Sequence, residues 1–427
     1  MNETLTEAEA ARPAPLARER IYRRNFGFFL TDGILFMLAI GLIGSTTVIP
    51  DFVRRLTDSQ VLIGLSGNLF ELGWTLPQLF IARVIVRAGR KKWWFVGPNL
   101  PVRCVILLFA GLILLLGPTR PEVLLLAFFV CYGLAALGDG LVGVPWADLA
   151  GSSLDQRWRA RLFGVQNAVT GVLLLGFAPL LALILGRLEF PANYALLFGL
   201  AGLLFALSSV PMLFIQELPG AHAQTTIPPL SEFLPDLGWV LRTDGPFRAI
   251  VLTRMLTSLL AMAGPFYIGF ATGPLALSSD VAVPTLLAVQ TVGSIGGALG
   301  YIWLGAHKNV LYMRLALGGA LLLPAGALLA AWVGPLPLYI GFLLSGPALS
   351  NLFFSYQNWV VSYAPPERRP LYAGLFNTLS AGATLAAPLI GGTLAERLGY
   401  EPLFAVAWLM GLAALFMTLR YLGDRSK

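Results

Sequence analysis

The sequence predicts an all-α membrane protein with twelve transmembrane helices arranged in two bundles of six. Two observations support this fold class. First, 57% of the 427 residues are hydrophobic and only 12% are charged, which is more apolar surface than one soluble core could hide. Second, a long stretch in the middle of the chain is repeated near its C-terminal end. The chain is therefore expected to consist of two related halves.

Apolar segments of membrane-spanning length recur along the whole sequence. Each reaches the length of about 20 residues that a helix needs to cross the hydrocarbon. Most lack the polar stripe, with a period of 3.6 residues, that a soluble bundle would show. We expect twelve spans, at about 25–49, 61–85, 93–116, 122–146, 163–186, 194–215, 248–272, 281–304, 310–333, 336–362, 371–395 and 402–421.

The repeat joins the stretch from Leu137 to Pro179 to a second stretch about 210 residues later. In each copy a tryptophan ends one apolar segment, an arginine-bearing loop follows, and the next segment carries Gly-x-x-Asn and then Ala-Pro. Four matches in the same order indicate a duplicated half. The matched pairs are Trp146 and Trp359, Gly164 and Gly374, Asn167 and Asn377, and Pro179 and Pro388.

The domain organisation follows from the spans and the repeat. The longest loop separates the two halves, and its polar composition is typical of a linker between bundles. We expect a cytoplasmic N-terminal tail at 1–24, an N-terminal six-helix bundle at 25–215, a cytoplasmic linker at 216–247, a C-terminal six-helix bundle at 248–421, and a cytoplasmic C-terminal tail at 422–427.

The net charge of +7 is distributed according to membrane topology. Of the 29 Lys and Arg residues, 22 lie in or next to the N-terminal tail, the even-numbered loops and the C-terminal tail, five lie in or next to the opposite loops, and two, Arg103 and Arg254, lie in the interior of spans. This asymmetry follows the positive-inside rule and predicts that both termini are cytoplasmic in a cell membrane. It explains the basic charge without nucleic acid, which we do not expect as a partner.

Neither a cofactor nor a metal is expected. Cys104 and Cys131 lie in apolar spans, His222 and His307 lie in loops, and no His, Cys and acidic residues have metal-site spacing. Enzymatic motifs are also incomplete. The run 64–67 spells the G-x-S-G of membrane serine proteases, but no span contains a histidine base. Since no P-loop motif occurs either, we expect no catalytic residue and no ATP hydrolysis.

The loop after the second span contains Arg87, Gly89, Arg90 and Lys91. This run resembles the loop signature of the major facilitator superfamily, G-x-x-x-D-R-x-G-R-[RK], with Val86 in the place of its Asp. The resemblance, including twelve spans in halves of six, covers about residues 20 to 422. It implies two bundles related by an axis along the membrane normal, which rock about a site at the midplane. For the charges alone, a basic loop that obeys the topology rule is the alternative.

Five ionisable side chains lie within the predicted spans, where each costs about 2.5–3.5 kcal/mol at the helix centre. They are candidates for a substrate or proton pathway: Asp32, Glu71, Arg103, Asp139 and Arg254. Amides in the spans are candidates for lining a cavity: Asn68, Gln78, Asn167, Gln290, Asn351 and Asn377.

Two pairings are suggested among these charges. Arg103 and Asp139 lie at matching depths, so a structural pair between them is as plausible as a substrate role. Asp32 and Arg254 occupy equivalent positions in the two halves, and the resemblance places their helices on opposite sides of the central path. We expect them to approach when the cytoplasmic side closes, or else to form a permanent pair. A charge swap that restored transport would favour the gate.

The sequence therefore predicts a secondary active transporter that moves a small solute by alternating access. Proton coupling is expected, with Asp32, Glu71 and Asp139 as candidate protonation sites. The expected partners are the lipid bilayer, an unknown small-molecule substrate and protons, and we expect a monomer. The alternative is a non-transporting sensor or scaffold with the same fold.

The first testable prediction concerns topology. Single cysteines at Ser59 and Ser278, in a background without Cys104 and Cys131, should react with a membrane-impermeant reagent on intact cells, because both loops lie on the side that is poor in Lys and Arg. Labelling only after permeabilisation would reverse the orientation.

Overall fold

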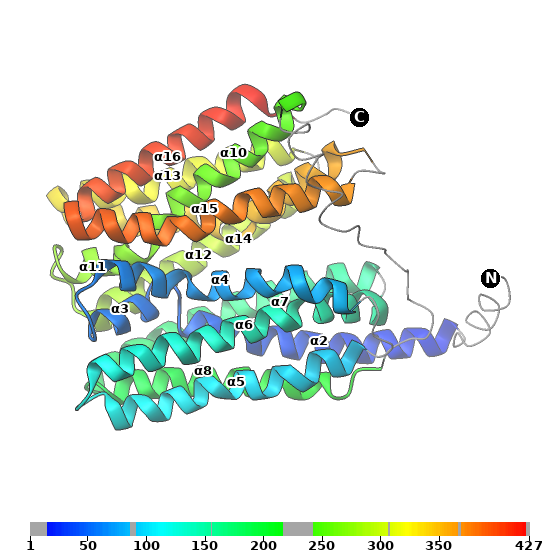
Figure 1. Ribbon diagram of the computed structural model, residues 1–427, viewed down its shortest axis with the longest axis horizontal. Helices are drawn as coiled ribbons and strands as arrows, with labels where there is room; N and C mark the ends of the chain where they lie inside the picture. The colour runs from blue at the N-terminus through cyan, green and yellow to red at the C-terminus, as the bar shows by residue number, and fades with distance from the viewer. Residues whose placement is uncertain are drawn as a thin grey trace. The chain divides into compact units, whose positions relative to one another are not determined.

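The computed structural model describes residues 15–85, 91–154, 156–216, 242–305, 308–365 and 369–423. In these ranges the regular secondary structure is helical and no strand occurs (Figure 1). The all-α class predicted from the sequence is confirmed. In chain order the elements are α2 (Pro15–Leu42), α3 (Val48–Arg54), α4 (Gln60–Ile85), α5 (Lys91–Leu116), α6 (Pro121–Ser153), α7 (Gln156–Arg187), α8 (Ala192–Met212), α10 (Gly245–Leu260), η1 (Ala261–Phe266), α11 (Tyr267–Thr272), α12 (Ser279–Leu304), α13 (Asn309–Val333), α14 (Leu336–Tyr363), α15 (Arg369–Leu398) and α16 (Tyr400–Tyr421).

These helices correspond to the predicted spans. Within the described ranges, 11 helical segments are long and apolar enough to cross a membrane, and α4 covers the remaining predicted span, 61–85. The first helix begins at Pro15, before the predicted start of the span at 25. The predicted tail at 1–24 thus includes the helical residues 15–24.

The first span of each half is interrupted rather than continuous. In the first half, α2 ends at Leu42 and α3 begins at Val48, and the carbonyl of Gly44 accepts from the N–H groups of Thr47 and Ile49 at 3.1 and 3.2 Å. In the second half, α10 runs into the 3₁₀ helix η1 before α11. Pro265 within η1 has no N–H to continue an α-helix.

The matched residues of the repeat occupy equivalent elements. Trp146 lies near the end of α6 and Trp359 near the end of α14. In each half the next helix carries the matched proline in its interior, Pro179 in α7 and Pro388 in α15. The order of elements is therefore the one that a duplicated half requires.

The chain divides into two compact units whose borders differ from the expected bundle limits. The first unit comprises residues 1–43, 69–173 and 187–227, and the second comprises 44–68, 174–186 and 228–427. The borders fall inside α4 and α7 as well as in the linker. The division into bundles at 25–215 and 248–421 stays a prediction.

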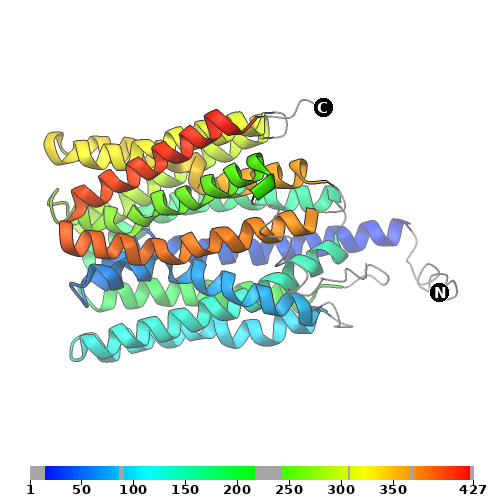
Figure 2. The same ribbon diagram turned by 45° about the horizontal axis from the view of Figure 1, so that its top comes forward.

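Within the first unit, α5 runs alongside both α6 and α8 (Figures 1 and 2). A core of buried apolar side chains joins these helices to α2, and Phe29, Phe95, Val142 and Met212 are among its members. The ring centroid of Phe95 lies 6.0 Å from the guanidinium carbon of Arg103, so this core adjoins a buried charge.

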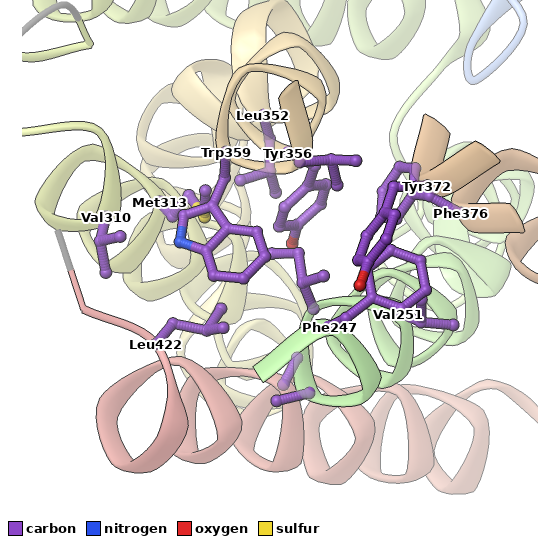
Figure 3. Packing of buried hydrophobic residues seen from close by; sticks show 14 of the residues in the cluster. Phe247, Val251, Val310, Met313, Leu352, Tyr356, Trp359, Tyr372, Phe376 and Leu422 are labelled. Atoms are coloured by element: carbon purple, nitrogen blue, oxygen red, sulfur yellow. The ribbon is translucent and has the colours of Figure 1, made fainter. Parts of the chain in front are cut away.

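Within the second unit, a large buried cluster lies where α10, α14 and α15 meet α13 and α16. Phe247 and Val251 approach Tyr372 in this cluster, and Trp359 lies over the side of α13 (Figure 3). One carboxylate ties three of these helices together. Asp244 caps α10 by accepting from the N–H of Phe247 at 3.0 Å, and it also accepts from the hydroxyls of Tyr363 at 2.7 Å and Tyr372 at 2.9 Å.

One row of glycines allows α12 and α14 to pack closely. A Cβ atom added at Gly293 would collide with the backbone of Leu343, and one added at Gly346 would collide with the backbone of Gly293. By contrast, a Cβ at Gly296 would meet nothing within 4 Å. The small residues at this interface let the two backbones approach.

The second prediction uses this contrast. Gly293→Ala should destabilise the protein by about 1–3 kcal/mol, because the new methyl group overpacks a backbone contact. Gly296→Ala is the matched control, which should leave stability unchanged or raise it by up to about 1 kcal/mol through helix propensity. The unfolding midpoint in detergent measures both. Equal effects of the two substitutions would contradict the close approach.

Candidate functional site

A buried ionic network is centred on Arg103 in α5 of the first unit. Its Nη1 donates to Oδ1 of Asp32 on α2 at 3.2 Å, and its Nη2 donates to Oδ1 of Asp139 on α6 at 3.4 Å. Arg103, Asp32 and Asp139 are 5%, 2% and 6% exposed. The structure thus contains the Arg103–Asp139 pair expected from the matched depths. It also adds Asp32, which the sequence did not link to Arg103.

Three neutral donors and acceptors extend this arrangement, which we call the Arg103 network, and the Nε of Arg103 is a buried atom without a hydrogen-bond partner among the described residues. The indole Nε1 of Trp146 donates to Oδ2 of Asp32 at 2.9 Å. Nη1 of Arg103 also donates to the hydroxyl oxygens of Ser208 and Ser209 on α8, the latter at 3.4 Å. Such polar groups are needed because a buried ion pair is favourable only when its remaining hydrogen-bonding atoms find partners.

Sequence reasoning did not find Trp146, Ser208 or Ser209 as members of the network. Trp146 appears there only as a marker of the repeat, and the sixth span, 194–215, reads as almost uniformly apolar. The sequence feature that could have identified the two serines was the presence of polar residues within an otherwise apolar span. Ser208 and Ser209 are buried, whereas Leu207 and Val210 on the same helix are exposed, so at this level α8 turns its polar side chains inward.

Glycines beside Asp139 allow α6 to come close enough for this contact. A Cβ atom at Gly138 would collide with the side chain of Val102, the residue before Arg103. A Cβ at Gly140 would collide with the backbone of Trp74 on α4. The run Gly-Asp-Gly therefore places a short carboxylate between two tightly packed helices.

The charges of the network do not cancel. One guanidinium faces two carboxylates, so the formal charge is −1 when both acids are ionised and zero when one of them carries a proton. The guanidinium carbon of Arg103 also lies 4.9 Å from the ring centroid of Phe36, where the face of the ring attracts a cation. The network can therefore hold or release one proton while its arginine keeps a carboxylate partner.

The second unit presents mainly neutral polar groups near Arg254. Arg254 is half-buried on α10, and its guanidinium carbon lies 5.4 Å from the ring centroid of Phe353. One turn further, Thr257 shares a 2.8 Å hydrogen bond with the hydroxyl of Tyr356. Asp32 and Arg254 belong to different units, so their approach stays a prediction.

The other predicted residues are distributed over both units. Glu71 lies on α4 with an exposed side chain, and Asn68 donates to the carbonyl of Gly64 in its own helix at 3.1 Å. The remaining amides have polar partners: Gln290 accepts from Thr46 at 3.4 Å, Asn351 donates to Ser350 at 2.9 Å, and Asn377 accepts from Gln357 at 2.7 Å.

Some of the predicted site residues lie outside the part of the chain that the structure describes. Arg87, Gly89 and Arg90 are outside the described residues, as are the side chains of Lys91, Gln78 and Asn167. Within the described ranges no three His, Cys, Asp or Glu residues gather in a group that could hold a metal ion.

A second polar cluster, which we call the outer cluster, lies within the second unit, where it joins α3 and the start of α4 to α12 and α16. Ser279 donates to Oδ1 of Asp51 at 3.1 Å, and Asp51 is 4% exposed. Arg54 donates to the hydroxyl of Tyr400, which in turn donates to Oε1 of Gln60 at 3.4 Å. These contacts connect residues of the first half of the sequence to the second half, on the side predicted to be non-cytoplasmic.

Comparison with known proteins identifies the family of this chain. Residues 33–380 match the profile of the Major Facilitator Superfamily. The chain belongs to this superfamily. It is a multi-pass membrane protein, and by family and fold it groups with membrane transporters.

Solved structures of other facilitators share the fold. A variant of the nucleoside transporter NupG superposes with a TM-score of 0.69 at 15% identity, covering 93% of this chain and 100% of that one. A bacterial homologue of the iron transporter ferroportin, in an inward-facing state, superposes with a TM-score of 0.67 at 16% identity, covering 96% of this chain and 100% of that one. At these identities the likeness concerns the fold alone.

One curated relative matches a short part of the chain. The phospho-N-acetylmuramoyl-pentapeptide-transferase of Desulfotalea psychrophila is 32% identical over 129 residues, which cover 25% of this chain and 36% of that protein. The chain thus spans about a third of the length of this relative.

The third prediction tests the charge balance of the Arg103 network. Arg103→Met should destabilise this facilitator by about 3–5 kcal/mol, because it leaves two buried carboxylates without their cation. Asp139→Asn should cost less, since Arg103 keeps Asp32 as its partner. Thermal unfolding in detergent measures the order of stability of the two variants. Arg120→Met, at an exposed position of the same unit, is the control. An Arg103 variant no less stable than the Asp139 variant would contradict the network.

Proposed function

We propose that the protein is a proton-coupled secondary transporter that moves a small solute across the cell membrane by alternating access, with both termini in the cytoplasm. The observation that carries this proposal is the Arg103 network. It holds two carboxylates around one guanidinium, all at most 6% exposed. Inserting a charged group into the membrane interior costs free energy, and in membrane proteins such groups mark ion and substrate pathways.

Within the network, Asp139 is the proposed carrier of the proton. Both oxygens of Asp32 accept hydrogen bonds, from Arg103 and from Trp146. In the described part of the chain, Asp139 accepts through Oδ1 from Arg103, which leaves Oδ2 as the place for a proton. A protonated Asp139 makes the network neutral, and an ionised Asp139 restores the charge of −1. This change of charge couples proton movement to the packing of α2, α5, α6 and α8.

A non-transporting sensor or scaffold is the second candidate function. A scaffold has no need for a network with unequal charges, since apolar residues of similar volume are often as stable as a buried ion pair. The network therefore favours the transporter.

The fourth prediction tests coupling. After a thermal-shift screen has identified a solute, proteoliposomes with an imposed pH gradient should accumulate it, and a protonophore should abolish the accumulation. Asp139→Asn imitates the protonated carboxyl, so it should retain solute exchange but lose at least about 90% of gradient-driven accumulation. Asp58→Asn, at an exposed loop position, is the matched control. Gradient-driven accumulation that persists in Asp139→Asn would contradict this role.

Alternating access requires that contacts at one side break while those at the other side form. The outer cluster supplies such contacts, because the hydrogen bonds described above join polar side chains at or near helix ends. Each can be exchanged for water at a modest free-energy difference, which suits a barrier between conformers that differ by a few kcal/mol.

The fifth prediction concerns this outer cluster. Arg54→Ala removes the contact with Tyr400 and should lengthen the distance between spin labels at positions 59 and 278, because the outer side opens more often. Arg187→Ala, which removes an exposed arginine at the end of α7, should leave the distance distribution unchanged. An unaltered distribution in Arg54→Ala would exclude the outer cluster as a closing contact.

A further inference from the structure

A cavity between α2 and α7 lies in the first unit, and no member of the Arg103 network is among the described residues that line it. Its volume is about 540 Å³, and the described residues that line it are Glu19, Arg23 and Phe26 from α2 and Trp158 and Arg161 from α7. Ligand cavities in proteins usually measure about 300–1,000 Å³. The space is therefore sufficient for a phosphate group with part of an attached organic moiety.

The cavity has an aromatic floor and a cationic rim. Phe26 and Trp158 are half-buried and pack with ring centroids 5.1 Å apart. The guanidinium carbon of Arg161 lies 5.7 Å from the centroid of Phe26 and 5.5 Å from that of Trp158. At these distances both ring faces attract the guanidinium, and Arg161 is exposed.

Arg23 supplies a second exposed guanidinium, and Glu19 supplies one exposed carboxylate. The formal charge of the lining is +1. Guanidinium groups bind phosphate oxygens through two parallel hydrogen bonds, which an ammonium group cannot do. The carboxylate is an acceptor for a hydroxyl or ammonium group carried beside that phosphate.

The cavity lies at the level of the membrane surface. The apolar, membrane-spanning part of α2 begins at Glu19, and that of α7 begins at Ala168, about two turns after Arg161. Aromatic side chains gather at this level in membrane proteins, and basic pockets between helices on the cytoplasmic side bind lipid headgroups. The charge pattern of the sequence assigns this end of the helices to the cytoplasm.

We propose that this cavity binds a phosphate group at the cytoplasmic membrane surface, through Arg23 and Arg161, with the organic part of the ligand against Phe26 and Trp158. An anionic phospholipid headgroup and a free phosphate share this chemistry. The site is separate from the proposed transport pathway and does not depend on it.

The experiment measures the unfolding midpoint of the purified full chain in neutral detergent, titrated with phosphatidylglycerol, phosphatidylcholine or inorganic phosphate. Phosphatidylglycerol should stabilise the wild type. Arg23→Gln and Arg161→Gln should each weaken its apparent affinity about fivefold, because each basic side chain near a membrane surface contributes about 1 kcal/mol. Arg161→Lys keeps the charge but loses the planar fork, and it should fall between wild type and Arg161→Gln.

Arg420→Gln is the matched control. Arg420 is also exposed at a helix end and lies 5.7 Å from the ring centroid of Tyr421, but it does not line the cavity. Its variant should bind phosphatidylglycerol as the wild type does. Competition by inorganic phosphate would identify free phosphate as a ligand, and stabilisation by phosphatidylglycerol alone would identify the lipid headgroup.

Two results would overturn the proposal. One is an equal loss of affinity in Arg420→Gln, which would mean general attraction between a basic protein and anionic lipid. The other is unchanged affinity in both Arg23→Gln and Arg161→Gln. Gel filtration and the midpoint without lipid show whether each variant is folded. Both arginines are exposed, and the midpoint without lipid also reports the cost of losing the contact of Arg161 with Phe26 and Trp158.

Discussion

The burial of one guanidinium group constrains the whole first unit. Removing a charge from water costs several kcal/mol even after relaxation, and only well-placed partners recover that cost. Arg103 obtains them from three other helices, with Asp32 on α2, Asp139 on α6 and two serines on α8. The positions of these helices are therefore fixed by hydrogen-bond geometry at one depth and by apolar packing elsewhere.

The two halves have diverged in how they use the same helices. In the first half, Trp146 donates its indole N–H to Asp32. Its counterpart Trp359 stacks on Tyr363 with ring centroids 4.6 Å apart, inside an apolar cluster. Arg254 lies against an aromatic ring where the first half has a buried ionic network. Duplication thus preserved the helix order, while the matched tryptophans came to have different partners.

The sequence was sufficient to predict the fold, because hydropathy and charge asymmetry are properties of whole segments and not of single side-chain contacts. It predicted the spans and the repeated order of α6–α7 and α14–α15, and matched depth indicated the Arg103–Asp139 pair. It could not assign Asp32 to Arg103, since that contact depends on the rotation of α2 about its axis. Ser208 and Ser209 were missed because an apolar composition does not show which face of a helix is buried. Glycine spacing was ambiguous too: Gly293 packs against a backbone, whereas Gly296 faces open space.

The separation of Asp32 from its partner along the chain has a consequence for biosynthesis. Arg103 follows Asp32 by 71 residues, so the first helix leaves the ribosome long before the third. A carboxylate in the apolar part of a helix opposes insertion by about 2.5–3.5 kcal/mol at the bilayer centre. Until Arg103 has been synthesised, the free energy of the first helix is lower when Asp32 stays near the water interface or beside the insertion machinery. The first four helices, which together carry all three charges of the network, are therefore expected to settle into the bilayer as a group rather than one by one.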